Sequence, residues 1–399
     1  MKLTVRIIQV LVGALFIVSG LVKANDPVGL AYKMDEFFIV WNSSLSSGNF
    51  FAKDLLIGLF GFLNRNALAL SLIIITLEIV SGIALLIGWK KKAVLYLLLA
   101  LILFFTFLTG YAYFAKHPNG TPKFTNCGCF GDCLPITPGT SFAKDILLLV
   151  MIVALLAGQK YIQPLFTRTV RMAILAGSLI VTLLLQWYVL QYLPLVDCLP
   201  FKEGNNIAEQ MKPPKGAVPD SIAMRFIYVK DGKQYEFAPE NLPADLDSYE
   251  FKDRIDKLVR KGNAIPRIQG FSLTGKERLD TTTGTSSKQD STAIVLGLPE
   301  AVIGFGMEDS EGEWLEDLKE LVASAKQKKV PVFFASHNPD AFRNLFERRG
   351  IDVQVFACDF TNIRTAARSD PTFYHLRAGT IIQKYSPKHI EDIAEELKQ

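Results

Sequence analysis

The sequence lacks the short motifs that mark many soluble enzymes: it has no phosphate-binding P-loop, no dinucleotide-binding glycine pattern and no nucleophile elbow. Histidine is scarce, with four in 399 residues, and these are too scattered to form a metal cluster. Heptads and internal repeats are absent as well. The net charge is only +4, which argues against a nucleic-acid partner. The informative features are long apolar segments and a small group of cysteines.

The apolar residues are concentrated in one half of the chain. Residues 1–198 are mostly apolar, whereas residues 199–399 have the charged composition of an ordinary soluble protein. A helix needs about 20 apolar residues to cross a bilayer. The first segment could instead be a signal peptide, since Val22-Lys23-Ala24 resembles a cleavage site. We expect the lipid bilayer to surround spans at about 7–22, 67–89, 93–115, 142–159 and 172–196.

Basic residues predict the orientation of these spans, because Lys and Arg concentrate in cytoplasmic loops. The N-terminal segment, the Lys90-Lys91-Lys92 connection and residues 160–171 hold eight basic residues in 21 positions. The two alternate loops, 22–66 and 116–141, hold six in 71. We therefore expect a multi-pass protein of the cell (inner) membrane with a cytoplasmic N-terminus. The 116–141 loop and the whole C-terminal half would then be extracytoplasmic.

Four of the five cysteines are expected at one membrane face. Cys127, Cys129 and Cys133 lie between the third and fourth spans, and Cys198 follows the fifth. Thiols outside the cytoplasm tend to oxidise, and four cysteines allow three complete pairings, among which the sequence does not choose. A Cys127–Cys129 ring would be strained and therefore easily reduced. Cys358 follows an apolar segment, so we expect a buried thiol that packs as a small hydrophobe.

One carboxylate is expected inside the membrane. Glu78 lies near the centre of the second span, where a charge costs about 2.5–3.5 kcal/mol. It could belong to a proton relay or a polar pocket, or it could only make a structural hydrogen bond to Thr106, Thr182 or Gln186. Small residues recur on the first two spans and predict close helix packing: Gly13, Ser19, Gly20, Ser81, Gly82 and Gly88.

Three segments of the N-terminal half resemble a bacterial membrane family. They are Gly13-x-x-Phe16-x-x-Ser19-Gly20-Leu21-x-Lys23, Leu77-Glu78-Ile79-Val80-x-Gly82 and Cys127-Gly128-Cys129-Phe130-Gly131. Over roughly residues 1–160 they resemble the DoxX/MauE family, and the cysteine segment is the most specific of the three. MauE-type members are associated with methylamine-dehydrogenase maturation and extracytoplasmic disulfide formation. The resemblance implies a four-helix core with an external cysteine loop, and the additional span and long tail imply a different client.

The segment after the spans predicts a spacer followed by a small folded unit. Residues 199–220 are rich in Pro, Gly and Asn, as in semi-rigid linkers. Residues 223–230 and 233–238 flank an Asp231-Gly232 turn and predict a hairpin. We expect a helix at 247–261 and a mobile loop at 280–291.

From about residue 293 the pattern alternates strand and helix, which predicts a mixed sheet covered by helices. The order of elements resembles the thioredoxin fold, with Ser369-Asp370-Pro371 where thioredoxins carry a cis-proline; we therefore expect a cis bond before Pro371. Thioredoxins place Cys-x-x-Cys after the first core strand, but residues 308–313 contain no cysteine and four acidic side chains. Because acidic neighbours oppose a thiolate, we expect this domain to bind or position a client and to be redox-inactive by itself.

The fold class expected is an α-helical membrane bundle followed by an extracytoplasmic α/β thioredoxin-like domain. The boundaries are 1–160 for the DoxX/MauE-like domain, 161–198 for the fifth transmembrane helix, 199–292 for the linker with a small α+β segment, and 293–399 for the thioredoxin-like domain.

Three functions remain open. In the first, Cys127, Cys129, Cys133 and Cys198 exchange disulfides with an exported client protein, and Glu78 moves protons or lines a pocket of quinone size. In the second, the same cysteines form static disulfides in a membrane scaffold or maturation factor. In the third, they bind Zn, Cu(I) or an Fe–S cluster, although the spacing is not the common Cys-x-x-Cys pair. The sequence alone does not prove catalysis.

Overall fold

The computed structural model describes residues 2–46, 53–116, 123–124, 133, 136–219, 221–260, 262–275, 278–279, 286–287, 289–309 and 311–398. Within these ranges, five helices are long and apolar enough to cross a membrane. They confirm the expected spans: α1 (Lys2–Asn25), α4 (Ala67–Leu86), α5 (Lys91–Phe114), α6 (Pro138–Ala157) and α7 (Arg168–Gln191). The fourth starts earlier than expected, because the Thr137 side chain caps the helix by accepting from the Thr140 N–H, with Pro138 at the first helical position.

Close packing of α1 against α4 holds the bundle together. A Cβ atom on Gly13 would lie 2.5 Å from the Leu86 side chain, and one on Gly82 would lie 2.9 Å from the Gly13 carbonyl oxygen. Only glycine allows the two backbones to approach this closely, as the small residues of the sequence predict. Helix α7 stands at the edge of the bundle with few buried side chains, and Gln186 ties it to α4 by donating to the Leu72 carbonyl at 3.2 Å.

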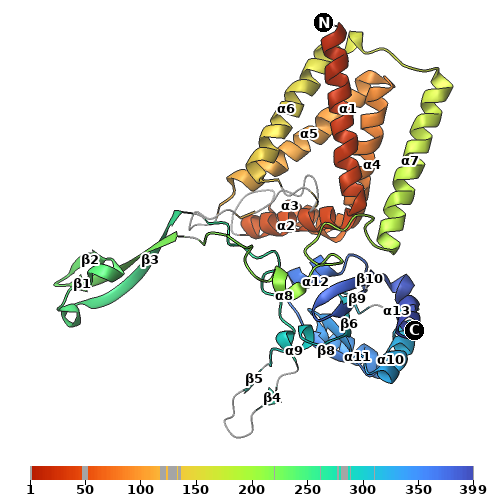
Figure 1. Ribbon diagram of the computed structural model, residues 1–399. Helices are drawn as coiled ribbons and strands as arrows, with labels where there is room; N and C mark the ends of the chain where they lie inside the picture. Colours follow the sequence, from red (N-terminus) through yellow and green to blue (C-terminus); the bar gives the residue numbers. More distant parts are fainter. Residues whose placement is uncertain are drawn as a thin grey trace.

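Two further helices cross one end of the bundle. They are α2 (Pro27–Ser46) and α3 (Lys53–Arg65), and they lie in the 22–66 segment that the sequence predicts as a loop. In Figure 1, α2 runs across the ends of the spans and separates them from the C-terminal half. Its buried residues recur at helical spacing on one face: Pro27, Leu30, Ala31, Met34, Phe37 and Phe38. Helix α2 therefore forms the surface of the membrane half that the C-terminal half can contact.

The bundle has two distinct ends. The N-terminus, the α4–α5 connection and the α6–α7 connection gather at one end, and the C-terminal half lies at the other (Figure 1). The basic residues that predict the cytoplasmic side all belong to the first end, whereas Cys133 and Cys198 belong to the second.

A three-stranded sheet extends from the body as an arm (Figure 1). It is formed by β1 (Ser221–Lys230), β2 (Lys233–Phe237) and β3 (Glu250–Arg260) in the order β2-β1-β3, with antiparallel neighbours. The predicted hairpin is confirmed, but the helix predicted at 247–261 is wrong, because residues 250–260 pair with β1. Between β2 and β3 lie two short 3-10 helices, η2 (Pro239–Asn241) and η3 (Leu246–Ser248).

The C-terminal region is built on a five-stranded mixed sheet in the order β10-β9-β6-β7-β8. Strands β6 (Ala301–Gly306), β7 (Val332–Ser336) and β8 (Gln354–Ala357) are parallel, whereas β9 (Thr372–Arg377) pairs antiparallel with both β6 and β10 (Thr380–Tyr385). The alternation of strand and helix predicted from about residue 293, and the mixed sheet, are confirmed. The Asp370–Pro371 bond, for which the sequence predicts cis geometry, is cis.

Helices cover both faces of this sheet. One apolar core contains residues of α10 (Trp314–Lys328), α11 (Pro339–Arg349) and α13 (Ile390–Lys398), which follows the 3-10 turn η4 (Pro387–His389). The other core contains residues of α8 (Ile207–Gln210), α9 (Thr292–Leu296) and α12 (Phe360–Ala366). Helix α12 begins where the Asp359 side chain accepts from the Thr361 and Asn362 N–H groups. The predicted loop at 280–291 falls mostly outside the described residues, which include a short pair of strands, β4 (Arg278–Leu279) and β5 (Ser286–Ser287).

Candidate functional site

A disulfide joins Cys133, which precedes α6, to Cys198, which follows α7. Their Cα atoms are 4.8 Å apart, and the bond closes 65 residues of sequence. Both residues are partly exposed. The segment around Cys198 is also held by other contacts: Asn25 exchanges two hydrogen bonds with Val196, and Lys384 pairs with Asp197 at 2.7 Å. The disulfide therefore lies where the membrane half, the end of α7 and the C-terminal sheet meet.

The disulfide forms part of the wall of an open cleft of about 780 Å³. Pockets that bind organic ligands typically measure about 300–1,000 Å³, so the cleft can admit several side chains. Three separate parts of the chain line it: α2, the disulfide with the residues after it, and α12 together with residues 265–267. The lining is Gly29, Tyr32, Lys33, Glu36, Cys133, Cys198, Leu199, Pro200, Ile265, Pro266, Arg267, Thr361, Arg364, Thr365 and Arg368.

Basic side chains predominate in this cleft, with Glu36 as the single acidic residue among four basic ones in its lining. Arg364 pairs with Asp35 at 3.1 Å, and Lys33 pairs with Glu36 at 2.8 Å. Positive charge near a disulfide stabilises the thiolate that leaves when the bond is attacked. The electrostatics of the cleft are thus opposite to those of the acidic 308–313 junction in the C-terminal sheet.

The junction between the halves is an ion-paired and aromatic contact between α2 and the chain around α12. Asp26 caps α2 by accepting from the Gly29 N–H, and its second oxygen pairs with Arg368 at 2.9 Å. The Tyr32 ring lies 3.7 Å from the Arg364 guanidinium and 5.4 Å from that of Arg368. Burial raises the pKa of the Tyr32 hydroxyl to about 12, although the two arginines oppose the shift.

Tyr32 also contacts the loop that follows β6. Its hydroxyl donates to the Met307 sulfur at 3.0 Å. The carboxylate of Asp370 accepts from the Met307 and Glu308 N–H groups at 2.8 and 2.9 Å. The loop that follows β6 is therefore held by Asp370 and contacted by α2. Among the described residues of this loop there is no cysteine.

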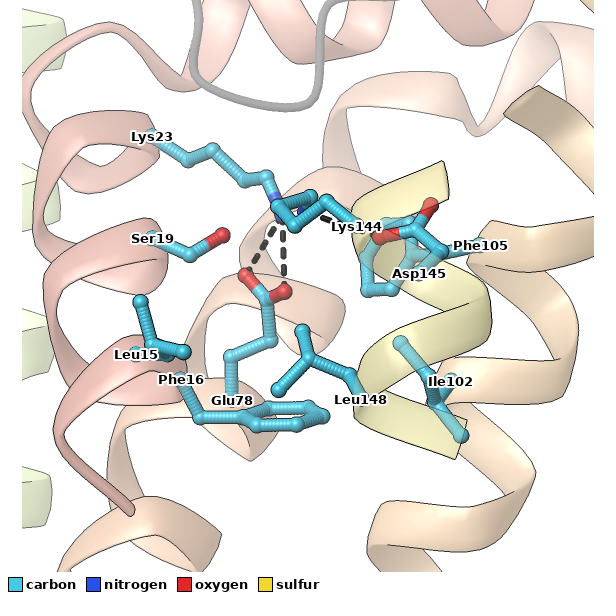
Figure 2. A pocket seen from close by; sticks show the side chains of 10 residues that line it. All are labelled: Leu15, Phe16, Ser19, Lys23, Glu78, Ile102, Phe105, Lys144, Asp145 and Leu148. Carbon is cyan, nitrogen blue, oxygen red and sulfur yellow. Dashed lines mark hydrogen bonds and ion pairs between the residues drawn. The ribbon is translucent and has the colours of Figure 1, made fainter. Parts of the chain in front are cut away.

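Inside the bundle, Glu78 is paired with Lys23 of α1. The Lys23 ammonium donates to both carboxylate oxygens of Glu78 at 2.7 and 2.8 Å (Figure 2), and both side chains are only 2 % exposed. The ammonium also lies 4.0 Å from the centre of the Phe105 ring. The partners predicted for Glu78 are wrong where they can be traced, because Thr182 and Gln186 bond to backbone carbonyls. Lys23 is already part of the family-like pattern, which was the signal that could have identified it.

A second ion pair faces the first. Lys144 pairs with Asp145 at 2.8 Å, and Thr109 donates to the same carboxylate at 2.9 Å. In Figure 2 the Lys144 and Asp145 side chains of α6 lie beside the Lys23–Glu78 pair. The cavity that they share is about 20 Å³, which is room for one water molecule. A quinone ring is larger than this cavity, which has room for water beside its polar groups.

The last turn of α1 lies between the Cys133–Cys198 disulfide and the buried Lys23–Glu78 pair. Val22 lines a small cavity with Cys133 and Cys198, and the next residue, Lys23, lines the cavity with Glu78. The disulfide and the buried ion pair are therefore neighbours across one helical turn, and the structure brings Cys133, Cys198 and Glu78 into one region of the molecule. Cys127 and Cys129 lie outside the described residues, whereas Cys358 is a buried free thiol whose pKa is raised to about 12 by burial.

Two known family models match separate parts of the chain. Residues 1–158 match the model of the family described as methylamine utilisation protein MauE. These residues form a MauE-family domain. The domain includes α1 to α6 and Cys133, whereas Cys198 lies beyond its end. Residues 222–261, which form the arm, match a domain of unknown function, DUF8463. No curated protein matches the chain.

Metal binding has no support from the part of the chain that the structure describes. Within these residues, no group of three or more His, Cys, Asp or Glu side chains converges as metal ligands. Two of the four cysteines that a metal site would use, Cys133 and Cys198, are bonded to each other.

Proposed function

We propose that the protein is a membrane thiol–disulfide exchange protein that acts on an exported client, with the Cys133–Cys198 disulfide as the bond that the client's thiol opens. The observation that carries this proposal is the position of the disulfide in the wall of a cationic cleft. A purely structural disulfide does not need access from solvent or a surrounding of positive charge, whereas exchange benefits from both.

Exchange also gives Cys127 and Cys129 a role. They precede Cys133 by six and four residues, which limits their Cα distance from it to about 22 and 14 Å. Both thiols are thus close enough in sequence to pass electrons between a client and the Cys133–Cys198 bond. Oxidation of a client dithiol delivers two electrons and two protons, and we propose an acceptor of the quinone class to remove them. Since the cavity at Glu78 has room for one water molecule, we assign proton transfer to Glu78 and Lys23 and propose that a quinone binds elsewhere.

The orientation that this function requires is cytoplasmic for the N-terminus and extracytoplasmic for the disulfide. The basic residues at the opposite end of the bundle support it. A reporter fused after Gln399 should be active only outside the cytoplasm, and an active cytoplasmic fusion would refute the orientation.

The C-terminal region would position the client rather than exchange disulfides. Its β6–α10–β7 and β9–β10 order supports the predicted thioredoxin-like arrangement, and its edge near Met307 contacts α2. This leaves the cleft as the approach to the disulfide.

Single-turnover oxidation tests the proposal. The purified protein in nanodiscs should convert a synthetic dithiol peptide to its disulfide, with one peptide oxidised for each Cys133–Cys198 bond lost. Cys198→Ser should lose turnover, because Cys133 then has no disulfide for the peptide thiol to attack, whereas Cys358→Ser should behave as the wild type. If the peptide stays reduced while the wild-type protein is folded, the proposal is wrong.

The second candidate function is a membrane scaffold or maturation factor in which the disulfide is static, and the 65-residue separation favours it. Closing a loop of this length contributes about 4 kcal/mol in the chain-entropy model. A staple predicts that Cys133→Ser and Cys198→Ser lower stability, while protein that still folds keeps its cellular function. Exchange predicts loss of function in folded variants.

A further inference from the structure

We propose that the cleft binds an extended, acidic segment of the client, so that the client's cysteine meets the Cys133–Cys198 bond; this proposal rests on the exchange function. The cleft combines a reactive bond, an apolar wall and an excess of basic side chains. Each of these features restricts the chemistry of the segment that fits.

The walls suit an extended peptide. The cleft is partly open to solvent, and its volume of about 780 Å³ corresponds to a few residues. Its apolar surface includes Pro200, Pro266 and Ile265, whose side chain is 54 % exposed although it is large and apolar. Contact between such a side chain and a ligand is favourable, because it removes apolar surface from water. Thr361 and Thr365 of α12 add hydroxyls to the lining.

The charges favour an acidic ligand. Arg364 and Arg368 have carboxylate partners on α2, Asp35 and Asp26. Arg267 differs, because it is exposed and forms no ion pair within the described part of the chain. It therefore offers a bidentate partner to a carboxylate next to the client's cysteine. A basic segment would find no comparable partner, because Glu36, the one acidic residue of the lining, is already paired with Lys33.

The bound segment would react by two balanced substitutions. The client thiolate attacks one sulfur of the Cys133–Cys198 bond, a mixed disulfide forms, and the other cysteine leaves as a thiolate among the basic side chains. The client's second thiol loses its proton to water and attacks the mixed disulfide. The client becomes a disulfide, and both cysteines of the protein are reduced by two electrons. The quinone-class acceptor named above returns them to the disulfide.

Peptide binding to the full-length protein in nanodiscs tests the substrate class. The probes are two fluorescent nonapeptides with alanine in place of cysteine, which differ only in acidic or basic flanking residues. We expect the acidic peptide to bind more tightly and its affinity to fall with salt. Arg267→Glu should weaken its binding about fivefold. The control Lys233→Glu, an exposed change on β2 of the arm, should leave it unchanged.

Equal binding of the two peptides, or equal losses in Arg267→Glu and Lys233→Glu, would overturn the inference. A small uncharged thiol, 2-mercaptoethanol, separates this failure from that of the exchange function. If it opens the Cys133–Cys198 bond in the folded protein while the peptides show no charge preference, only the substrate class is wrong. If neither it nor a cysteine-containing peptide opens the bond, the exchange function is wrong as well.

Discussion

The membrane bundle and the junction with the C-terminal half both depend on ion pairs, but they bury these pairs to different degrees. Lys23 and Glu78 are enclosed among the spans, each 2 % exposed. At the junction, the side chains of Arg364 and Asp35 are 13 % and 23 % exposed. A buried charge that loses its partner cannot be hydrated, whereas a charge at a junction can be solvated when the contact opens. The bundle should therefore be permanent, and the junction should be able to open.

The largest expected effect comes from breaking the buried pair. Glu78→Met leaves the Lys23 charge without its partner and should cost about 3–5 kcal/mol of stability. The double variant Lys23→Met/Glu78→Met removes both charges and should recover most of this loss. Thermal unfolding in nanodiscs measures both. If the single and double variants are equally unstable, the pair has no special part in holding the bundle.

The next effect is at the junction. Arg368→Met removes the pair with Asp26 and should weaken docking of the C-terminal half by about 1–3 kcal/mol without unfolding either half. Crosslinking between cysteines introduced on α2 and α12 measures docking. The exposed pair of Arg254 and Asp256 in the arm provides the matched control, since Arg254→Met should not change crosslinking. A global loss of stability in Arg368→Met would contradict a junction that opens independently.

A smaller effect should appear as a dependence on pH. Burial raises the pKa of the Asp370 carboxyl, although the Met307 and Glu308 N–H groups oppose the shift. Its contribution to stability is therefore complete below the unfolded pKa of about 3.9 and is lost as the pH rises through the folded pKa. Relative to Asp370→Asn, the wild type should lose stability as the pH rises from 4. A difference that is flat or grows with pH would contradict this.

The smallest effect is expected for the arm. Among the residues from 221 to 260 whose side chains the structure describes, none belongs to the buried hydrophobic core. Replacing this segment by a short Gly-Ser linker should change the stability of the rest by no more than about 0.5 kcal/mol. Truncation before α13, which buries Ile390 and Ile393 in the sheet core, provides the contrast and should be strongly destabilising. If arm deletion is equally harmful, the arm supports the fold through contacts beyond its own strands.

Local patterns predicted most of the fold, because the spans and the alternating elements after residue 293 are long or strongly periodic. Helix α2 was missed because its apolar face is too short to span a membrane, although Leu30, Met34 and Phe37 follow helical spacing. The helix at 247–261 was predicted wrongly because the segment has a helical spacing of apolar residues without forming a helix. Phe251, Ile255 and Val259 also follow helical spacing, yet the ladder with β1 makes the segment a strand.

The site was predicted in composition but not in arrangement. Cys127, Cys129, Cys133, Cys198 and Glu78 stand out in the sequence by residue type and position, because charges and thiols are rare in apolar surroundings. Their partners depend on how distant segments pack. Lys23 and Glu78 are 55 residues apart, and the arginines near the disulfide come from the other half of the chain. No local pattern contains that information.

The redox state of the Cys133–Cys198 bond in native membranes tests the account most directly. Membranes are quenched in acid, free thiols are tagged, and the two cysteines are quantified by mass spectrometry. The account predicts that the reduced fraction rises when a reduced dithiol substrate is supplied and falls again once the substrate is exhausted, while Cys358 stays unchanged. A bond that remains oxidised throughout, in protein that is folded and supplied with substrate, would contradict exchange and leave the disulfide as a staple.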